Sequence, residues 1–363
     1  MSNRLESLRR RMADNEVDVI LISQPYNRYY LSGFTGKDSP GGGTAGWLLI
    51  TQSEASILVG FLSLEQARHE CPAFDVVQVG AKPSEKVGEM ARTAGWRRLA
   101  CEGSHLTHTA YLDLASQVPE GCELVSIEGW VEEQRAVKGE DEIAKIRRAA
   151  AITDGALAHV VATARPGITG RELAWEAEKY MREAGAEAMA FEVGFGSGPE
   201  TSIPHSHPTG RRLKAGEPIW IDIGAQLEGY CSDLTRTFAL GEADPKLREI
   251  WELVYRAQQG ALRGCRPGMS GGEVDAIARD IIAEAGYGPG FGHSLGHGVG
   301  LVVHEGPRLA RESRDVLKPG MVVTFEPGVY LEGWGGVRLE DLGVIRESGV
   351  ELLSAAEKMM VVG

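Results

Sequence analysis

The hydrophobic pattern of the chain changes character near residue 128. Before that point, short apolar runs of strand length alternate with segments of helical periodicity, as is typical of an α/β unit. The runs that predict strands are residues 17–22, 47–50, 57–59 and 76–79. A glycine-rich stretch at residues 33–43 interrupts the pattern and predicts a loop. We therefore expect residues 1–128 to form an α/β domain.

From residue 139 onward, helical periodicity gives way to strand-rich, glycine-rich segments, and this order occurs twice. Thr169 is followed by Glu172 and Ser270 by Glu273, a spacing typical of a capping box at a helix start. Residues 129–363 are therefore expected to form an α+β domain, with helices on the outside of a curved antiparallel sheet.

Two segments of this second region recur about a hundred residues later in the chain. The sequence RPGITG at 165–170 returns as RPGMSG at 266–271. Residues 213–224 resemble residues 317–328, which brings Asp222 and Glu326 to one register of a duplicated unit. Two half-domains that face each other would bring these carboxylates together. Like charges held close need a proton or a metal ion, so the repeat predicts a metal site.

Three histidines, His293, His297 and His304, lie within twelve residues, and four glycines occur in the stretch 292–304 that contains them. The glycines disfavour a helix and predict extended or turning backbone. Residues 292–296 also fit the G-x-S-x-G pattern of a serine hydrolase. That alternative is disfavoured, because no acidic residue lies between Ser294 and His304, the last histidine, to complete the triad in order.

Carboxylates extend the histidine pattern into a ligand set. Asp233 follows Asp222 by eleven residues, in what would be the returning strand of a hairpin, and Glu340 follows Glu326 by fourteen. With His297 these residues supply four carboxylates and one imidazole. Hard oxygen ligands with one nitrogen suit a pair of Mn²⁺, Co²⁺ or Zn²⁺ ions better than a structural zinc ion.

Composition and charge exclude several other classes of protein. The net charge of −13 argues against nucleic acid, which requires clustered Lys and Arg. The five cysteines are widely spaced and include no C-x-x-C, so neither a disulfide framework nor a thiolate zinc site fits. The sequence shows no signal-peptide pattern and no apolar run long enough to cross a membrane. These features predict a cytoplasmic protein.

The combined motifs resemble the Xaa-Pro peptidases of the creatinase/aminopeptidase P/prolidase family. The matching stretches are residues 32–36, 203–205, 221–224, 232–237, 296–301, 304–305, 326–330 and 337–341. The resemblance spans the whole chain and implies a pita-bread catalytic domain with an internal pseudo-twofold repeat, preceded by a smaller α/β domain. It also implies a homodimer or homotetramer, in which loop 33–43 of one subunit could approach a neighbour's site.

By position, the resemblance assigns Asp222 to one metal ion, His297 and Glu326 to the other, and Asp233 and Glu340 to both. A hydroxide between the two ions would attack the scissile carbonyl, because two cations lower the pKa of water and stabilise the oxyanion. Glu326 would also carry the proton.

Further roles follow from the same resemblance. His205 and His304 would contact the substrate and stabilise the tetrahedral intermediate, and His293 would line the proline pocket. Arg338 could pair with Asp222 or Asp233, or help to bind the substrate. His207 matches no family role and is expected at the surface.

The implied substrates are Xaa-Pro dipeptides or short peptides with proline at the second position. The sequence leaves the dipeptidase and aminopeptidase types open, since both Arg308 and Arg338 could bind a product-side carboxylate. Two alternatives remain: a creatinase-like hydrolase that works without metal, and a binding module that has lost catalysis. Both are disfavoured because all five ligand positions are filled.

Overall fold

The computed structural model describes residues 2–39 and 43–362, and the chain divides into two compact units, Met1–Arg135 and Ala136–Gly363. The sequence pattern predicts the division at 128/129. Residues 129–135 group with the first unit because their side chains are bound there. Arg135 donates to the Asn27 side chain at 2.8 Å, and Glu133 pairs with Arg11 at 2.6 Å.

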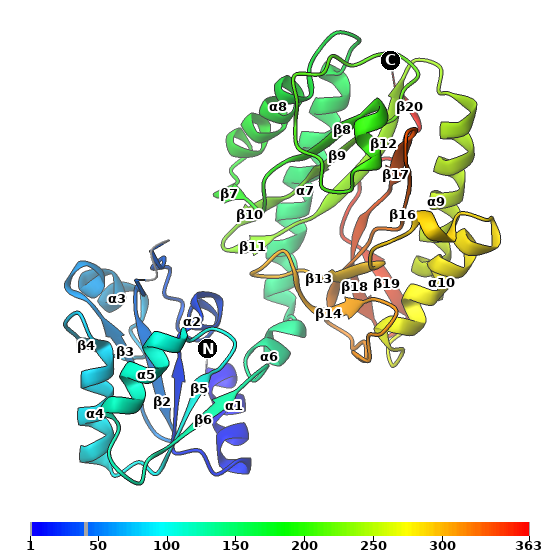
Figure 1. Cartoon of the computed structure of the whole chain (residues 1–363). Helices are drawn as coiled ribbons and strands as arrows, with labels where there is room; N and C mark the ends of the chain where they lie inside the picture. The colour runs from blue at the N-terminus through cyan, green and yellow to red at the C-terminus, as the bar shows by residue number, and fades with distance from the viewer. Residues whose placement is uncertain (1, 40–42, 363) are drawn as a thin grey trace. The chain divides into compact units, whose positions relative to one another are not determined.

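The first unit is built on one six-stranded mixed sheet with strand order β4-β3-β2-β1-β5-β6 and with helices packed beside it (Figure 1). Its strands are β1 Val19–Ile22, β2 Trp47–Thr51, β3 Ala55–Val59, β4 Asp75–Gln78, β5 Arg98–Glu102 and β6 Glu123–Ile127. Its helices are α1 Ser2–Asp14, α2 Pro25–Ser32, α3 Leu64–Glu70, α4 Pro83–Ala94, α5 His108–Gln117 and α6 Glu132–Ala136, with η1 Phe61–Ser63. The four predicted strands are confirmed, and β5 and β6 are additional.

The loop predicted at residues 33–43 begins where α2 ends. Gly33 has φ +82°, a conformation that favours glycine and stops the helix. Arg28, which is fully buried, then ties the loop to its own helix by an ion pair of 2.8 Å to Asp38. Residues 40–42, at the centre of this loop, lie outside the described residues.

The second unit repeats the order of two helices followed by strands. Its helices are α7 Glu140–Thr163 and α8 Gly170–Glu183 in the first half, and α9 Pro245–Gly264 and α10 Gly271–Glu284 in the second. Both predicted capping boxes are present. The backbone N–H of Thr169 donates to Glu172 at 2.8 Å, and that of Ser270 donates to Glu273 at 2.7 Å.

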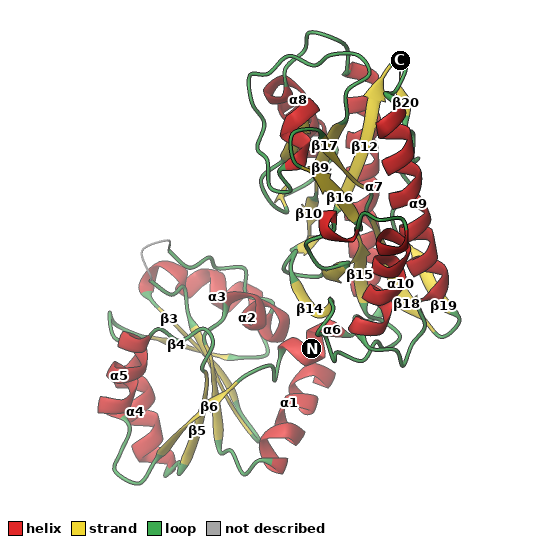
Figure 2. Cartoon of the chain, turned by 45° about the vertical axis from the view of Figure 1, so that its right-hand side comes forward, coloured by secondary structure: helices red, strands yellow, loops and turns green. Residues whose placement is uncertain are grey.

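The strands of this unit form two principal sheets, with helices α7–α10 on their outer sides (Figure 2). The sheets are β20-β12-β9-β8 and β14-β13-β15-β18-β19, and two smaller sheets are β11-β10-β7 and β16-β17. Their bounds are β7 Ala188–Met189, β8 Gly194–Ser197, β9 Ile219–Ile223, β10 Ala225–Leu227, β11 Tyr230–Cys231, β12 Leu234–Leu240, β13 Gly296–Gly298, β14 Glu305–Leu309, β15 Val322–Phe325, β16 Gly328–Leu331, β17 Gly335–Arg338, β18 Asp341–Arg346, β19 Gly349–Leu352 and β20 Val361–Val362, with η2 Gly198–Ser202 and η3 Gly288–Gly290.

Each helix pair has its own apolar core against its own strands, so the two halves of the second unit are separately packed. The carboxylates predicted from the repeat lie where strands of the two halves end. Among the helices of the described chain, none combines the length and apolarity that crossing a bilayer requires.

Candidate metal centre

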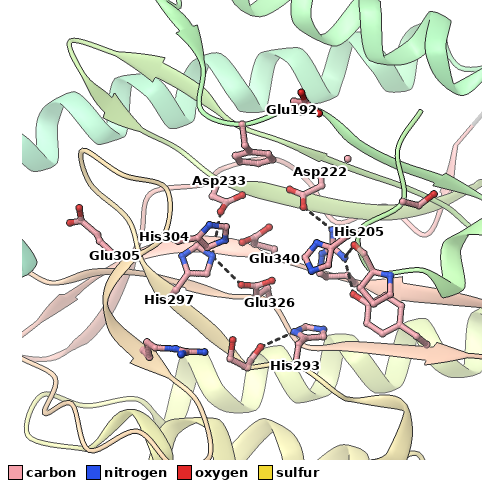
Figure 3. Close-up of a pocket in the computed structure, with 18 of the residues that line it drawn as sticks. Glu192, His205, Asp222, Asp233, His293, His297, His304, Glu305, Glu326 and Glu340 are labelled. Carbon is pink, nitrogen blue, oxygen red and sulfur yellow. Dashed lines mark hydrogen bonds and ion pairs between the residues drawn. The ribbon is translucent and has the colours of Figure 1, made fainter. Parts of the chain in front are cut away.

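One cavity of about 840 Å³ gathers all five predicted ligand residues (Figure 3). Asp222 lies on β9, and Asp233 immediately precedes β12, which pairs with β9. His297 is the central residue of β13. Glu326 directly follows β15, and Glu340 lies between β17 and β18. Each half of the second unit thus contributes side chains to a single cavity.

Three of these residues form a compact group that could hold a metal ion. Ligand atoms of Asp233, His297 and Glu340 all lie within 4.8 Å of one another. Glu326 adjoins this group, because His297 Nε2 lies 3.2 Å from Glu326 Oε1 and 3.6 Å from Asp233 Oδ2. Asp222 lines the same cavity but is not part of the compact group.

The backbone selects which nitrogen His297 offers to the cavity. Its Nδ1 lies 3.1 Å from the carbonyl oxygen of Gly298, and a carbonyl can only accept a hydrogen bond. Nδ1 must therefore carry the hydrogen, which leaves the lone pair on Nε2 in the neutral ring. This arrangement is typical of a metal-binding histidine.

Arg338 holds the Asp222 side of the cavity. Its Nη2 donates to Asp222 Oδ2 at 2.7 Å, its Nη1 to the Tyr330 hydroxyl at 2.8 Å and its Nε to Thr235 Oγ1 at 3.0 Å. The hydroxyl of Thr235 in turn donates to Glu340 at 2.8 Å. Of the two carboxylates predicted as partners of Arg338, it is Asp222 that forms the ion pair. The other oxygen of Asp222, Oδ1, is buried without a partner among the described residues.

Electrostatics show that this site is short of positive charge. Burial raises the pKa of Asp233 and Glu340 well above ordinary values, and the neighbouring carboxylates raise both further. Burial also raises the pKa of Asp222, although Arg338 opposes it. Divalent cations would remove this repulsion. The clustered carboxylates, the exposed lone pair of His297 and the orphaned oxygen of Asp222 thus fit such ions.

Glu326 differs from the other carboxylates. Burial alone would raise its pKa, but the hydrogen bond and charge of His297, together with the charges of His293 and Arg338, outweigh burial and lower the pKa to about 2. The same contact raises the pKa of His297 against the opposing effect of burial. Without metal, the two side chains contact each other at 3.2 Å, and each favours the charged form of the other. Glu326 stays ionised and can accept a proton.

The remaining histidines border the same cavity. The rings of His304 and His297 lie 4.2 Å apart, and burial lowers the pKa of His304. Burial also lowers the pKa of His293, whose ring packs 5.1 Å from Phe291. His205 is exposed at the rim. His207 is exposed as expected, yet it too lines the cavity, which the sequence did not indicate.

Comparisons with known proteins agree with this geometry. The model of metallopeptidase family M24 matches residues 144–347, and that of the creatinase/prolidase N-terminal domain matches residues 4–137. The chain belongs to metallopeptidase family M24. It is a metallopeptidase with the predicted pita-bread domain after a smaller α/β domain, and family membership implies a divalent metal cofactor.

Relatives of this M24 peptidase match it along nearly its whole length. A Xaa-Pro dipeptidase from Pyrococcus furiosus is 37% identical over 361 residues, which cover 99% of this chain and 100% of the relative. The structure of a Xaa-Pro dipeptidase from Bacillus anthracis is 36% identical with a TM-score of 0.94 and covers 99% of both chains. An X-Pro aminopeptidase from Thermotoga maritima is 33% identical with a TM-score of 0.87, covering 96% of this chain and 98% of the other.

The serine-hydrolase alternative is wrong for this M24 peptidase. Ser294 is followed by the short strand β13, whereas a nucleophile elbow requires a helix after the serine. Two side chains of the site, Tyr330 and Thr235, were not predicted from the sequence. Both lie inside the motifs quoted for the family, but only the fold shows that they hold Arg338 and Glu340.

Proposed function

We propose that this metallopeptidase hydrolyses the bond between an N-terminal residue and proline, using two divalent ions. Asp222 would hold one ion, His297 and Glu326 the other, and Asp233 and Glu340 both. The observation that carries the proposal is the convergence of four carboxylates and one imidazole on a single cavity. The relatives described as Xaa-Pro dipeptidases support the choice of substrate.

When bound, the two ions would lower the pKa of a water molecule and stabilise negative charge on the substrate carbonyl. The side chains of the chain do the rest. Glu326 is ionised and can take a proton from the nucleophile and deliver it to the leaving nitrogen. His205 and His304 border the cavity where they can donate hydrogen bonds to the developing oxyanion.

Proline suits the region around His293. The ring of His293 lies 5.1 Å from that of Phe291, edge to face, and 5.5 Å from the tilted ring of Tyr330, which gives an aromatic wall of inclined rings. Because proline lacks an N–H and has a fixed φ, a site that recognises its ring needs no backbone hydrogen bond at that residue. The wall can therefore accept proline where a backbone-binding site would reject it.

Arg308 favours the dipeptidase type over the aminopeptidase type. Arg338 is committed to Asp222, Tyr330 and Thr235. Arg308 lines the cavity, is exposed, and makes no side-chain hydrogen bond or ion pair with any described residue. A free guanidinium at this place could bind the terminal carboxylate of a dipeptide.

The test is hydrolysis of Ala-Pro, Ala-Pro-Ala and Ala-Pro-NH₂ by protein stripped with chelator and resupplied with Mn²⁺, Co²⁺ or Zn²⁺. Metal-dependent cleavage of Ala-Pro well above the other two supports a dipeptidase, and Arg308→Gln should then remove that preference. Arg311→Gln, at another exposed arginine nearby, is the control. Preferential cleavage of the tripeptide would identify an aminopeptidase. No cleavage with any metal would reject the proposal in favour of a creatinase-like enzyme or a binding module.

A further inference from the structure

A single buried amide contacts the backbone immediately before each of the two glutamates of the metal centre. Gln258 lies on α9 and is fully buried. Its Nε2 donates to the carbonyl oxygen of Phe325 at 2.9 Å and to that of Leu339 at 3.1 Å. These carbonyls lie 67 and 81 residues from Gln258 in the sequence, and each belongs to the residue immediately before a glutamate of the metal centre.

The position of these two carbonyls matters because a peptide unit is planar. The carbonyl of Phe325 shares its plane with the N–H of Glu326, and the carbonyl of Leu339 shares its plane with the N–H of Glu340. The two N–H groups are held as well, by Leu295 O at 2.8 Å and by Thr235 O at 3.1 Å. Both planes are thus fixed on two sides, and the amide of Gln258 links one plane to the other.

The internal repeat supplies a comparison within the molecule. The C-cap residues of helices α7 and α9, Ala164 and Cys265, are equivalent in the repeat, so Gln258 corresponds to Leu157 of the first half. Leu157 is buried in the apolar core of that half. The helix therefore packs on its strands without an amide at this position.

A second observation also argues against a purely structural role. The Oε1 of Gln258 is buried and has no partner among the described residues, which costs stability. Local conflicts of this kind are expected where function, and not packing, selects a residue. The repeat and the orphaned oxygen together indicate that the amide serves the metal centre.

We infer that Gln258 is a positioning residue that sets the separation of the Glu326 and Glu340 carboxylates and thereby the affinity of the centre for divalent ions. This inference rests on the proposed metal centre but not on the identity of the peptide substrate. Side chains that orient metal ligands from behind commonly change metal affinity 10–100-fold when they are replaced, so an effect of about that size is expected here.

The test is calorimetric titration of chelator-treated protein with Mn²⁺, together with metal content after gel filtration and thermal unfolding without metal. Gln258→Met keeps the length of the side chain but removes the donor. We expect it to bind Mn²⁺ about 10-fold or more weakly while the metal-free protein keeps its fold. Leu157→Met, at the repeat-related position, is the matched control and should bind Mn²⁺ as the wild type does.

Gln258→Glu is a second variant that removes only one of the two hydrogen bonds. It tests the role of Gln258 in Mn²⁺ affinity even if Gln258→Met does not fold. A buried, protonated carboxyl can donate to only one of the two carbonyls, so its Mn²⁺ affinity should be lower than that of the wild type. Affinity within twofold of the wild type in the variant that folds would overturn the inference, as would an equal loss in Leu157→Met. A wild-type protein that binds no divalent ion would reject the metal centre itself. Failure to cleave Xaa-Pro peptides would reject only the proposed substrate.

Discussion

Individual side chains of the centre are arranged to favour metal binding at the expense of the metal-free fold. Asp233 and Glu340 are 5% and 2% exposed, and burial with like charge raises the pKa of both. In contrast, another buried carboxylate of the same unit, that of Asp341, is paired with Arg236 at 2.7 Å. The site carboxylates thus oppose folding until cations are bound.

Neutral replacements should therefore separate stability from metal binding. We expect Asp233→Asn and Glu340→Gln to stabilise the metal-free protein by about 1–2 kcal/mol, because each removes a buried charge from a repelling cluster. Both should lose metal retention and turnover. Urea unfolding and metal analysis of the purified variants test this. Full activity in either variant would contradict the dinuclear assignment, and Ser294→Ala should keep substantial activity.

The same shifts predict how stability depends on pH. The pKa values of Asp233 and Glu340 are raised from 3.8 and 4.5, so above these values the metal-free folded state binds more protons than the unfolded chain. Their contribution to stability is complete below those values and is lost as the pH rises through the raised pKa values. Glu326, with a pKa lowered to about 2, acts oppositely, but its contribution is complete above pH 4.5.

Between pH 5 and pH 8, the stabilisation that Mn²⁺ provides should therefore grow, because the ions bind the deprotonated carboxylates. The measurement is the free energy of unfolding in urea with and without Mn²⁺ at several pH values. Asp233→Asn is the control and should flatten the dependence. A metal increment that stays constant or shrinks with rising pH would show that these carboxylates are not the ligands.

At the scale of single elements, β13 depends on the two glycines that flank His297. A Cβ on Gly298 would lie 2.1 Å from the carbonyl oxygen of Gly306, and a Cβ on Gly296 would lie 2.1 Å from that of Thr324. The neighbouring backbones therefore approach β13 too closely for any side chain. This close approach fixes the backbone that directs His297 into the cavity.

Gly298→Ala should displace β13 and with it the imidazole. We expect a loss of about 1–3 kcal/mol in stability, typical of overpacking, together with weaker Mn²⁺ binding. Gly292→Ala is the matched control, because its Cβ would meet no described atom within 4 Å. Thermal unfolding and calorimetry compare the two variants. If Gly298→Ala is as stable and binds Mn²⁺ as tightly as Gly292→Ala, then β13 tolerates a side chain at this position.

Elements with a local signal were predictable from the sequence, and those that depend on distant partners were not. Both capping boxes and the extended backbone around the histidines follow from residue type and spacing. Strand β5 has only three consecutive apolar residues between Arg98 and Glu102, and β6 is half exposed, so neither has a clear pattern. Gln258 interrupts an apolar helix face, but its two acceptors lie 67 and 81 residues away, where no local pattern indicates them.

At the scale of the whole chain, the duplicated unit explains why the metal centre could be predicted before any fold was known. Equivalent positions of two similar halves meet at one cavity, so a repeat in the sequence becomes a cluster in space. Each half keeps its own apolar core, and the first unit, Met1–Arg135, has a further core in its sheet. Divalent ions at the centre would therefore join two packed halves of Ala136–Gly363 by bonds to both.

Metal removal should accordingly destabilise the second unit selectively. At 100 times its dissociation constant, a ligand stabilises the folded state by about 2.7 kcal/mol, which in a unit of this size raises the melting temperature by roughly 5–10 °C. Four of the seven tryptophans lie in this unit, and one of them, Trp220, is fully buried with Arg338 4.7 Å from its ring. The tryptophan fluorescence transition of the whole chain should therefore contain a component that shifts with Mn²⁺ in the wild type and not in Asp233→Asn. A shift that survives in Asp233→Asn would place the stabilising ions elsewhere in the chain.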